Sequence, residues 1–484
     1  MIFPLYDEFV SLAKDYDIIP VYTRFLADTE TPITVFQKLV GSDTGCLLES
    51  AAENKYLGRY SFIGYDPMMM LRFRNGKGHL SLAEGPEQEV HGEPLTVLKE
   101  LLSRYRFCLV AELPRFYGGA VGYLAFEALQ SGTDSLKTGS DELGIPDCHL
   151  FFPKVIIIFD HLYHQLTIVV NCLLKDEQPA GVYRKAVAQL KKIQEKLAMP
   201  LSGPGPGCTV DPPQATVTDH EFQTMVARGI DCVKEGRVDQ VVVSRRFSCN
   251  FQGDDFLFYR RLRSINPSPY MYYLNLGDMK CIGSSPEMLL RVEEGRVTTC
   301  PIAGTRRRGE TPEEDRRLAA ELLADPKELK EHEILVEFAV RDLERICAVD
   351  SVEITGRLEP QFFSHVIHLT SRVEGRLKGE LHTVDALAAC FPAGTVSGSP
   401  REEAMRIIAE LEPGRRGVYG GAVGYFGFNH TVDTAIAIRT LIVKDGRIYI
   451  QAGAGVVADS VPARELEEVN EKARGMFKAL SINY

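Results

Sequence analysis

Two pairs of glutamates in the chain could together hold a metal ion. Glu328 and Glu331 are three residues apart, as are Glu465 and Glu468, and a proline that could open a helix precedes each pair. A spacing of three places both carboxylates of a pair on one helical face. If the two helices face each other, the four carboxylates form a hard oxygen site of the kind Mg²⁺ prefers. The same spacing also fits carboxylates that stabilise helix N-termini or lie in solvent, and spacing alone favours that simpler interpretation.

A histidine and an arginine-rich loop could also take part in chemistry. His368 lies in VIHLTS, whose alternation predicts a strand, where a single histidine is more often a core residue than a catalyst. The loop 301–309 carries Arg306, Arg307 and Arg308. Their charge could attract an acid or simply keep a surface loop hydrated. The sequence leaves both alternatives open.

Two glycine-containing segments could bring backbone groups close to a ligand. Residues 393–401, AGTVSGSPR, lead into a predicted helix start that could offer N–H groups to a carboxylate, although an ordinary turn and cap is commoner. Gly453 and Gly455 follow a predicted strand, Ile448 to Gln451, and could let the backbone approach a ligand. A single G-x-G is weak support for a site.

The elements that must position these residues fall into two halves. Residues 200–213, PLSGPGPGCTVDPP, can continue neither a helix nor a central strand, which marks a boundary. Thr218 and Glu221 then form a capping-box pattern that predicts a helix to about Val233. We therefore expect an N-terminal half at 1–199, a linker at 200–217 and a C-terminal half at 218–484.

The two halves also share sequence motifs. Residues 63–72, IGYDPMMMLR, match 282–291, IGSSPEMLLR, and YGGAVGY occurs at both 117–123 and 419–425. These repeats indicate an ancient duplication in which both halves contribute strands and helices to one body. Met68 in the first copy corresponds to Glu287 in the second, and most of the polar candidates lie in the second half. We therefore expect the chemistry in the C-terminal half.

Composition excludes several classes of function. The 484 residues are 45% hydrophobic and 25% charged, as in a globular chain, and no apolar run reaches membrane-spanning length. A net charge of −11 disfavours nucleic-acid binding. The eleven cysteines form no C-x-x-C pair and the first residues do not resemble a secretory signal, so we expect a cytoplasmic protein. Phosphate-loop, dinucleotide and G-x-S-x-G motifs do not occur.

The order and spacing of the motifs resemble the chorismate-utilising enzymes, and among them the anthranilate synthase component I (large-subunit) family. The similarity covers nearly the whole chain. It is carried by LLES at 47–50, GRYSFIG at 58–64, NPSPYMYYL at 266–274, SPEMLL at 285–290, PIAGT at 301–305, LKEHEILVEFAVRDL at 329–343, VIHLTS at 366–371, PAGTVSGSP at 392–400, YGGAVGY at 419–425, AIAIRT at 435–440, QAGAG at 451–455 and EVNEKA at 468–473. The resemblance implies an α+β fold of two related halves, with antiparallel β-sheets packed face to face and helices outside.

The resemblance also implies roles for individual residues. Glu331 and Glu468 would bind Mg²⁺ directly, with Glu328 and Glu465 as indirect partners. Glu287 would be the general acid that protonates the departing C4 hydroxyl of chorismate, a role that requires a raised pKa. His368 and Thr395 would lie near the reacting ring. The substrate would be bound by Gln240, Ala303, Gly304, Thr305, Tyr419, Arg439, Gly453, Gly455 and Lys472.

Two positions distinguish the expected reaction from those of sibling enzymes. Aminodeoxychorismate synthases of similar sequence typically carry a nucleophilic lysine where this chain has Ala303. Enzymes that add water typically carry a lysine base near the position of Gln240. We therefore expect the addition of ammonia to chorismate and the elimination of pyruvate, which gives anthranilate. A sibling chorismate enzyme and a catalytically silent amino-acid-binding regulator remain as alternatives.

The family resemblance further implies a partner and an inhibitor. The chain shows no G-x-C-x-G nucleophile motif, so ammonia is expected from a separate glutamine amidotransferase subunit. Feedback inhibition by tryptophan is expected between the two halves. The residues implied as its contacts are Glu49, Ser50, Pro269, Tyr270, Met271 and Tyr272.

Overall fold

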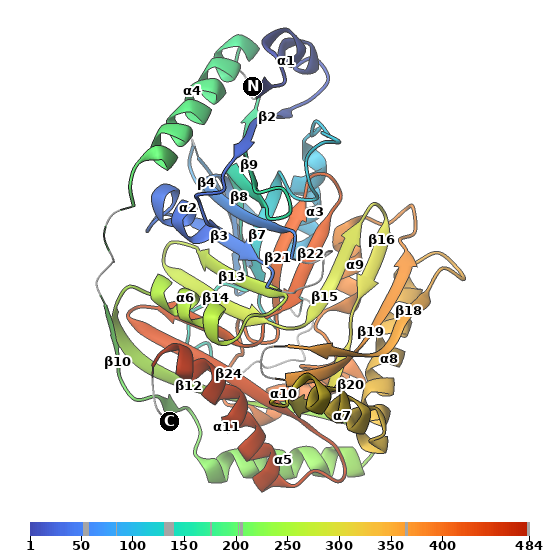
Figure 1. Ribbon diagram of the computed structural model, residues 1–484. Helices are drawn as coiled ribbons and strands as arrows, with labels where there is room; N and C mark the ends of the chain where they lie inside the picture. Colours follow the sequence, from blue (N-terminus) through green and yellow to red (C-terminus); the bar gives the residue numbers. More distant parts are fainter. Residues whose placement is uncertain are drawn as a thin grey trace.

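The computed structural model describes residues 1–51, 58–83, 85–129, 140–174, 177–201, 203, 207–363 and 366–481. The paired strands of the described residues run antiparallel to their neighbours in every ladder, and helices cover them (Figure 1). The fold is therefore α+β, as expected from the motifs. No helix among the described residues is long and apolar enough to cross a membrane.

The N-terminal half is built around β2, β9, β8, β4 and β3, which pair in that order. Its strands are β1 (Ile2–Phe3), β2 (Ile18–Leu26), β3 (Gly45–Glu49), β4 (Tyr60–Arg74), β5 (Lys77–Leu82), β6 (Gln88–Val90), β7 (Gly119–Leu124), β8 (Cys148–Asp160) and β9 (Gln165–Leu173). Its helices are α1 (Tyr6–Leu12), α2 (Pro32–Leu39), α3 (Pro94–Arg104) and α4 (Pro179–Ala198).

The C-terminal half repeats this order with β12, β24, β23, β14 and β13. Its strands are β10 (Cys208–Val210), β11 (Gln214–Ala215), β12 (Gln240–Gly253), β13 (Tyr270–Asn275), β14 (Met279–Ser285), β15 (Met288–Glu293), β16 (Arg296–Thr299), β17 (Ile302–Arg307), β18 (Glu353–Phe362), β19 (Val366–Arg376), β20 (Gly398–Ser399), β21 (Ala422–Gly427), β22 (Val432–Ile436), β23 (Thr440–Lys444) and β24 (Arg447–Val456). Its helices are α5 (Asp219–Lys234), α6 (Phe256–Ile265), α7 (Pro312–Leu323), α8 (Pro326–Ile346), α9 (Thr383–Cys390), α10 (Arg401–Leu411) and α11 (Pro462–Ala479).

The two halves meet along strands that are themselves counterparts. β7 and β21 carry the two copies of YGGAVGY and pair with each other, so that Gly122 lies opposite Gly424, its own counterpart. β3 precedes the motif at 63–72 and β13 precedes its second copy at 282–291, and these two strands also pair with each other. The structure thus confirms the duplication and shows that the halves are related by an approximate two-fold arrangement.

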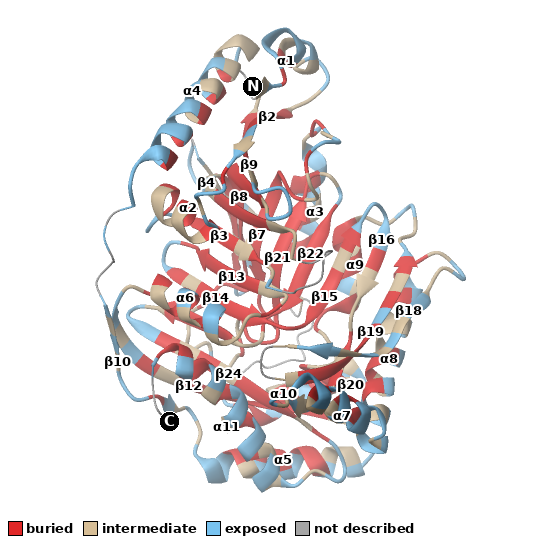
Figure 2. Ribbon diagram, in the orientation of Figure 1, coloured by how far each residue is buried: buried red, intermediate tan, exposed pale blue. Residues whose placement is uncertain are grey.

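Alternate residues of the strands face two separate cores. On β8, Ile156 and Ile158 belong to the inner core between the facing sheets, which α3, α8 and α9 complete. Val155, Ile157 and Phe159 belong to the outer core under α2, α4, α5, α6, α10 and α11. Figure 2 shows the central strands as almost entirely buried, whereas the outer surfaces of α5, α7 and α11 are exposed. This alternation is what a sheet buried on both faces requires.

The helix boundaries predicted from the sequence are confirmed. Thr218 caps α5 through a capping box with Glu221, and Asp325 caps α8 by accepting hydrogen bonds from the backbone of Lys327 and Glu328. α11 begins at Pro462. Both helices that carry the glutamate pairs therefore exist, and each pair lies near the start of its helix.

Two details of the sequence prediction need correction. Gly453 and Gly455 do not follow a strand but lie within β24, which continues to Val456 because it pairs with β12 along its full length. The linker is not wholly irregular, since β10 and β11 pair with β12; residues 202 and 204–206 of the linker lie outside the described residues. The domain boundaries themselves stay a prediction.

Candidate active site

Glu287 lies where the long strand of the duplicated motif is interrupted. β14 ends at Ser285 and β15 begins at Met288. The interruption is held in place because the Ser285 hydroxyl donates to the Ile436 carbonyl (2.7 Å) and the Ile436 amide donates to the Glu287 carbonyl (3.1 Å). The acid side chain therefore projects from a fixed backbone.

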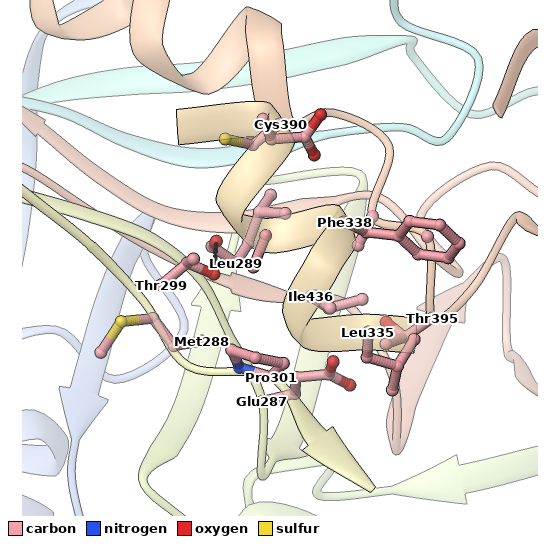
Figure 3. Close-up of a pocket in the computed structure, with 14 residues that line it drawn as sticks. Glu287, Met288, Leu289, Thr299, Pro301, Leu335, Phe338, Cys390, Thr395 and Ile436 are labelled. Carbon is pink, nitrogen blue, oxygen red and sulfur yellow. Dashed lines mark hydrogen bonds between the residues drawn. The ribbon is translucent and has the colours of Figure 1, made fainter. Parts of the chain in front are cut away.

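The carboxyl group of Glu287 is in a dry setting. The residue is 8% exposed and borders a cavity of about 50 Å³ that Leu335, Thr395 and Ile436 also line (Figure 3). Burial raises the pKa of Glu287 to about 7, although the Thr395 hydroxyl and the cations of Arg439 and Lys472 lower it in part. A carboxyl with this pKa is partly protonated at neutral pH and can act as a general acid.

Thr395 presents a polar group beside this acid. Its Oγ1 atom is buried and makes no well-formed hydrogen bond among the described residues. It nevertheless lies close enough to Glu287 to lower the pKa of that carboxyl. A hydroxyl in this position can donate to the Glu287 carboxyl or to a bound ligand.

His368 is held as a neutral imidazole whose Nε2 atom has no hydrogen-bond partner among the described residues. Its Nδ1 atom lies 2.8 Å from the Gly304 carbonyl and 3.2 Å from the Thr305 hydroxyl. Because a carbonyl only accepts, Nδ1 carries the proton and Nε2 is left as an acceptor. Burial lowers the pKa of His368 to about 4, with Arg439 and Lys472 contributing. His368 is thus a hydrogen-bond acceptor rather than a cation at neutral pH.

The strand that contacts His368 is irregular at Gly304. β17 pairs with β19 through Ala303 opposite Leu369 and Thr305 opposite His368, with a register shift between them. Gly304 adopts a φ of 74°, which favours glycine. An added Cβ there would lie 3.2 Å from a carboxylate oxygen of Glu328. Gly304 therefore lies close both to His368 and to Glu328 on α8.

Two cations lie on the Glu287 side of the site. The half-buried guanidinium of Arg439 makes no ion pair or hydrogen bond among the described residues, and burial lowers its pKa despite the nearby Glu287. The Lys472 ammonium donates to the Gly453 carbonyl (2.9 Å) and to Glu468 (2.6 Å). An arginine without a partner in such a setting favours an anionic ligand.

The glycines of β24 let two other predicted residues approach the strand. A Cβ at Gly453 would lie 2.8 Å from the Tyr419 hydroxyl oxygen, and one at Gly455 would lie 2.3 Å from Nε2 of Gln240. Any larger residue would displace these side chains. Tyr419, Gln240, Gly453, Gly455 and Lys472 are therefore neighbours, as the family resemblance implied.

A buried ion pair that sequence reasoning missed supports Tyr419. Arg416 and Glu412 pair at 2.6 Å with almost no exposure, and the Arg416 guanidinium lies 5.6 Å from the centre of the Tyr419 ring. Glu412 also accepts from the amide and hydroxyl of Ser244, both at 2.8 Å. The i,i+4 spacing of Glu412 and Arg416 is present in the sequence, but it resembles an ordinary surface pair and gives no sign of burial.

The four glutamates on α8 and α11 lie within electrostatic reach of one another. Loss of surrounding water raises the pKa of Glu331, which still contacts solvent, and repulsion from Glu328 and Glu468 raises it further. Burial also raises the pKa of Glu465, with repulsion from Glu468 contributing. Mutually repelling carboxylates on two helices are a donor set that suits a hard divalent cation.

The carboxylates are not drawn together as a formed metal site would be. Within the described ranges, no three His, Cys, Asp or Glu side chains are arranged so that they could hold a metal ion. Glu328 instead accepts from Arg306 (3.3 Å), and Glu468 from Lys472. Carboxylate oxygens are the donors that Mg²⁺ prefers. In this structure, Arg306 and Lys472 neutralise part of the negative charge of these carboxylates.

The arginine loop is largely neutralised within the protein. Arg306 pairs with Asp325 (2.7 Å) as well as with Glu328, and Arg308 pairs with Asp315 (2.5 Å). These two residues pair with carboxylates at α7 and α8 of the protein itself, which neither alternative for this loop had included. Arg306 and Arg308 are therefore less available to an anionic ligand than Arg439, which has no ion pair among the described residues.

The residues expected to bind an inhibitor lie in two environments. Pro269 and Tyr270 line a cleft of about 1610 Å³ between the halves, and Oγ of Ser50 is buried without a hydrogen-bond partner among the described residues. Glu49 instead accepts from Tyr259 (2.6 Å) and Arg263 (3.1 Å). Met271 and Tyr272 are buried. The effector assignment stays a prediction, and Pro269 and Tyr270 are the residues of the set that line the cleft.

Comparison with known proteins gives a consistent result over the whole chain. Residues 46–478 match the family described as chorismate binding enzyme. The chain is 39% identical to anthranilate synthase component 1 of Acetivibrio thermocellus, with 99% of each chain covered, and 40% identical to that of Pseudomonas aeruginosa, with 98% of each covered. The crystal structure of anthranilate synthase component I from Streptococcus pneumoniae is 36% identical, with a TM-score of 0.79 and coverage of 94% of this chain and 99% of that one. The menaquinone-specific isochorismate synthase of Escherichia coli is 18% identical with a TM-score of 0.74 over 98% of both chains, which shows a shared fold.

Proposed function

The chain belongs to the chorismate binding enzyme family, and from that premise we propose that it is the large subunit of an anthranilate synthase. The reaction joins chorismate and ammonia and yields anthranilate, pyruvate and water. Similarity at about 40% identity over full length to proteins named anthranilate synthase component 1 supports this choice within the family. The product would serve tryptophan biosynthesis.

The observation that carries the proposal is the buried acid at Glu287 beside two cations. Loss of the C4 hydroxyl requires a proton donor, and Glu287, with its pKa of about 7, can supply a proton to that oxygen. Arg439 and Lys472 would bind the carboxylates of the substrate, helped by the backbone of Gly453 and Gly455 and by Tyr419. The proton donor and the anion-binding groups would thus act on one bound molecule.

His368 and Thr395 would act on the same ring. The free Nε2 of His368 can accept a hydrogen bond or a proton from the substrate, and Thr395 can donate one. Gln240 beside Gly455 and the loop Ala303, Gly304 and Thr305 beside His368 complete the proposed substrate contacts.

Magnesium is the proposed metal. Glu331 and Glu468 would hold it directly, and Glu328 and Glu465 would contact it through water. Bound there, Mg²⁺ would neutralise the ring carboxylate of chorismate and remove the repulsion among the four glutamates.

Two partners complete the proposal. Ammonia would come from a separate glutamine amidotransferase subunit, and tryptophan would inhibit the enzyme from the cleft at Pro269 and Tyr270. A cytoplasmic location is consistent with a biosynthetic enzyme of this kind.

The test is product fluorescence from the purified chain given chorismate, Mg²⁺ and an ammonium salt. We expect anthranilate emission that disappears with EDTA and in Glu331→Gln and falls with tryptophan. Chorismate consumed to another product would assign the chain to a sibling enzyme. No consumption, with tryptophan still bound, would identify a regulator. Undiminished activity in Glu331→Gln would overturn the metal assignment alone.

A further inference from the structure

A buried histidine next to a proposed metal ligand is hydrogen-bonded to a neighbouring strand. His332 follows Glu331 on α8, is 1% exposed, and its Nε2 atom lies 2.7 Å from Oγ of Ser371 on β19. Consecutive helical residues point about 100° apart. Glu331 can therefore face Glu468 on α11 while His332 faces the strand.

The serine in this contact connects three elements. Ser371 Oγ also accepts a hydrogen bond from the backbone amide of Leu358 (3.0 Å) on β18. Leu358 has a φ of 54° and lies where the β18–β19 register shifts. The chain from His332 through Ser371 to Leu358 thus ties α8 to both strands of this hairpin at its irregular point.

Ser371 lies on the same strand as His368, the histidine proposed to act on the substrate. Ser371 is three residues from His368 on β19, so the two face opposite sides of the strand. One strand therefore carries a proposed catalytic group on one side and, on the other, the attachment of the helix that carries Glu331.

We propose that the His332–Ser371 hydrogen bond is a positioning contact, which fixes the rotation of α8 and so holds Glu331 at the place where Mg²⁺ binds relative to His368. A helix packed by apolar contacts alone, here Leu335 and Val336 against the core, can shift by a fraction of a turn. A buried polar contact penalises such a shift because it leaves both partners unsatisfied. This inference rests on the proposed magnesium enzyme.

The chain provides a matched control in the other half. Ser61 on β4 lies 2.7 Å from Nε2 of His161, the same geometry in a residue that is also 1% exposed. This pair is in the N-terminal half, far along the chain from either glutamate helix. Removing its hydroxyl deletes a hydrogen bond of the same length, although a less buried one because His161 is exposed, without touching α8.

The experiment measures Mg²⁺ binding directly by titration calorimetry, without substrate, on the full chain. Ser371→Ala and His332→Leu are expected to weaken Mg²⁺ binding about tenfold. Because Ser371→Ala also removes the acceptor of the Leu358 amide, the double variant should weaken Mg²⁺ binding no further than Ser371→Ala alone. His332→Gln, whose amide can still bond to Ser371, should retain most of the affinity, and Ser61→Ala should equal wild type.

The outcomes separate this inference from the proposed function. Wild-type affinity in Ser371→Ala, or an equal loss in Ser61→Ala, would overturn the positioning role while leaving the enzyme assignment intact. A wild-type chain that neither binds Mg²⁺ nor forms anthranilate would overturn the proposed function and this inference together. Thermal unfolding of each variant confirms that the protein measured is folded, and either of Ser371→Ala and His332→Leu suffices for the test if the other does not fold.

Discussion

The two halves of the molecule share one arrangement of strands but place different kinds of residue at the same position of the duplicated motif. In the N-terminal half, β4 runs without interruption through the duplicated motif and places Met68 in the inner core. In the C-terminal half, the corresponding strand breaks into β14 and β15, and Glu287 lies at the break. A strand bulge between Pro67 and Met69 marks the same place in the first half. The position is thus irregular in both copies, and only the C-terminal copy carries an acid there.

The counterpart tyrosines show the same division. Tyr117 accepts a hydrogen bond from the amide of Val110 (3.0 Å), which is a structural contact. The Tyr419 hydroxyl makes no hydrogen bond among the described residues and lies against Gly453. The comparison teaches that the two copies differ in the hydrogen bonding of the same residue type: the tyrosine of the copy with the proposed site has no partner among the described residues.

The largest effect is expected from giving the second copy the residue of the first. Glu287→Met removes the proton donor, and kcat for anthranilate formation should fall about 10²–10⁴-fold. Mg²⁺ binding should persist, because the glutamates on α8 and α11 are unchanged. Product fluorescence and calorimetry on the same sample measure both. The reciprocal change, Met68→Glu, should lower the stability of the protein without adding activity. Substantial turnover in Glu287→Met would show that Glu287 is not the proton donor.

A second effect concerns stability against pH. The pKa of Glu287 is raised from 4.5 to about 7 in the folded state, so the folded protein favours the protonated form. Its contribution to stability is complete below pH 4.5 and is lost as pH rises through 7. Relative to Glu287→Gln, which cannot ionise, the wild type should therefore lose about 3 kcal/mol of unfolding free energy over that interval.

Urea unfolding of both proteins from pH 5 to pH 8 measures this difference. The two curves should converge at the acid end and separate toward pH 8. Parallel curves would mean that Glu287 ionises normally in the folded protein. Met68→Gln offers the matched control, because a neutral amide at the counterpart position adds no titration.

A third effect concerns the half that lacks the acid. Ser50→Ala removes a buried hydroxyl that has no hydrogen-bond partner among the described residues. It should raise the tryptophan concentration needed for inhibition about tenfold, as a coupling of about 1–3 kcal/mol allows. Activity without tryptophan should not change. Dose–response curves for tryptophan with Ser50→Ala and with the control Ser61→Ala measure this shift. Inhibition of Ser50→Ala at the same tryptophan concentration as wild type would place the effector site elsewhere.

The smallest effect separates the two tyrosines. Tyr419→Phe should lower kcat/KM about tenfold, since one hydrogen bond to a charged substrate is worth about 1.5 kcal/mol. Tyr117→Phe should cost about 1 kcal/mol of stability, because it leaves the Val110 amide unsatisfied, and should not change kcat/KM. Steady-state kinetics and denaturation of both variants test this, and equal kinetic effects would remove the distinction between the copies.

Periodicity, caps and motifs predicted much of the fold. The capping box at Thr218, the Asp325 cap and the strand around His368 are as expected, because these depend on residues adjacent in the chain. The duplicated motifs predicted two related halves. They did not predict that β7 pairs with β21, since strand pairing between distant segments depends on tertiary packing.

The site was only partly predictable for the same reason. Family motifs named the residues now found together around β24, but the extension of that strand past Gly455 depends on its partner β12. The Arg416–Glu412 pair and the His332–Ser371 contact were not predicted, because nothing in a local pattern indicates which polar residues become buried. The pairing of Glu328 with Arg306 was likewise invisible to spacing arguments.

The pairing of β7 with β21 and of β3 with β13 has a consequence for how the molecule comes apart. Separation of the halves would expose one edge on each of the four strands β3, β7, β13 and β21, with its unpaired N–H and C=O groups. Proteolytic nicking at 203–207 should therefore yield two fragments that stay associated and unfold in one transition. The covalent connection between the halves is dispensable for holding them together once the sheet has formed.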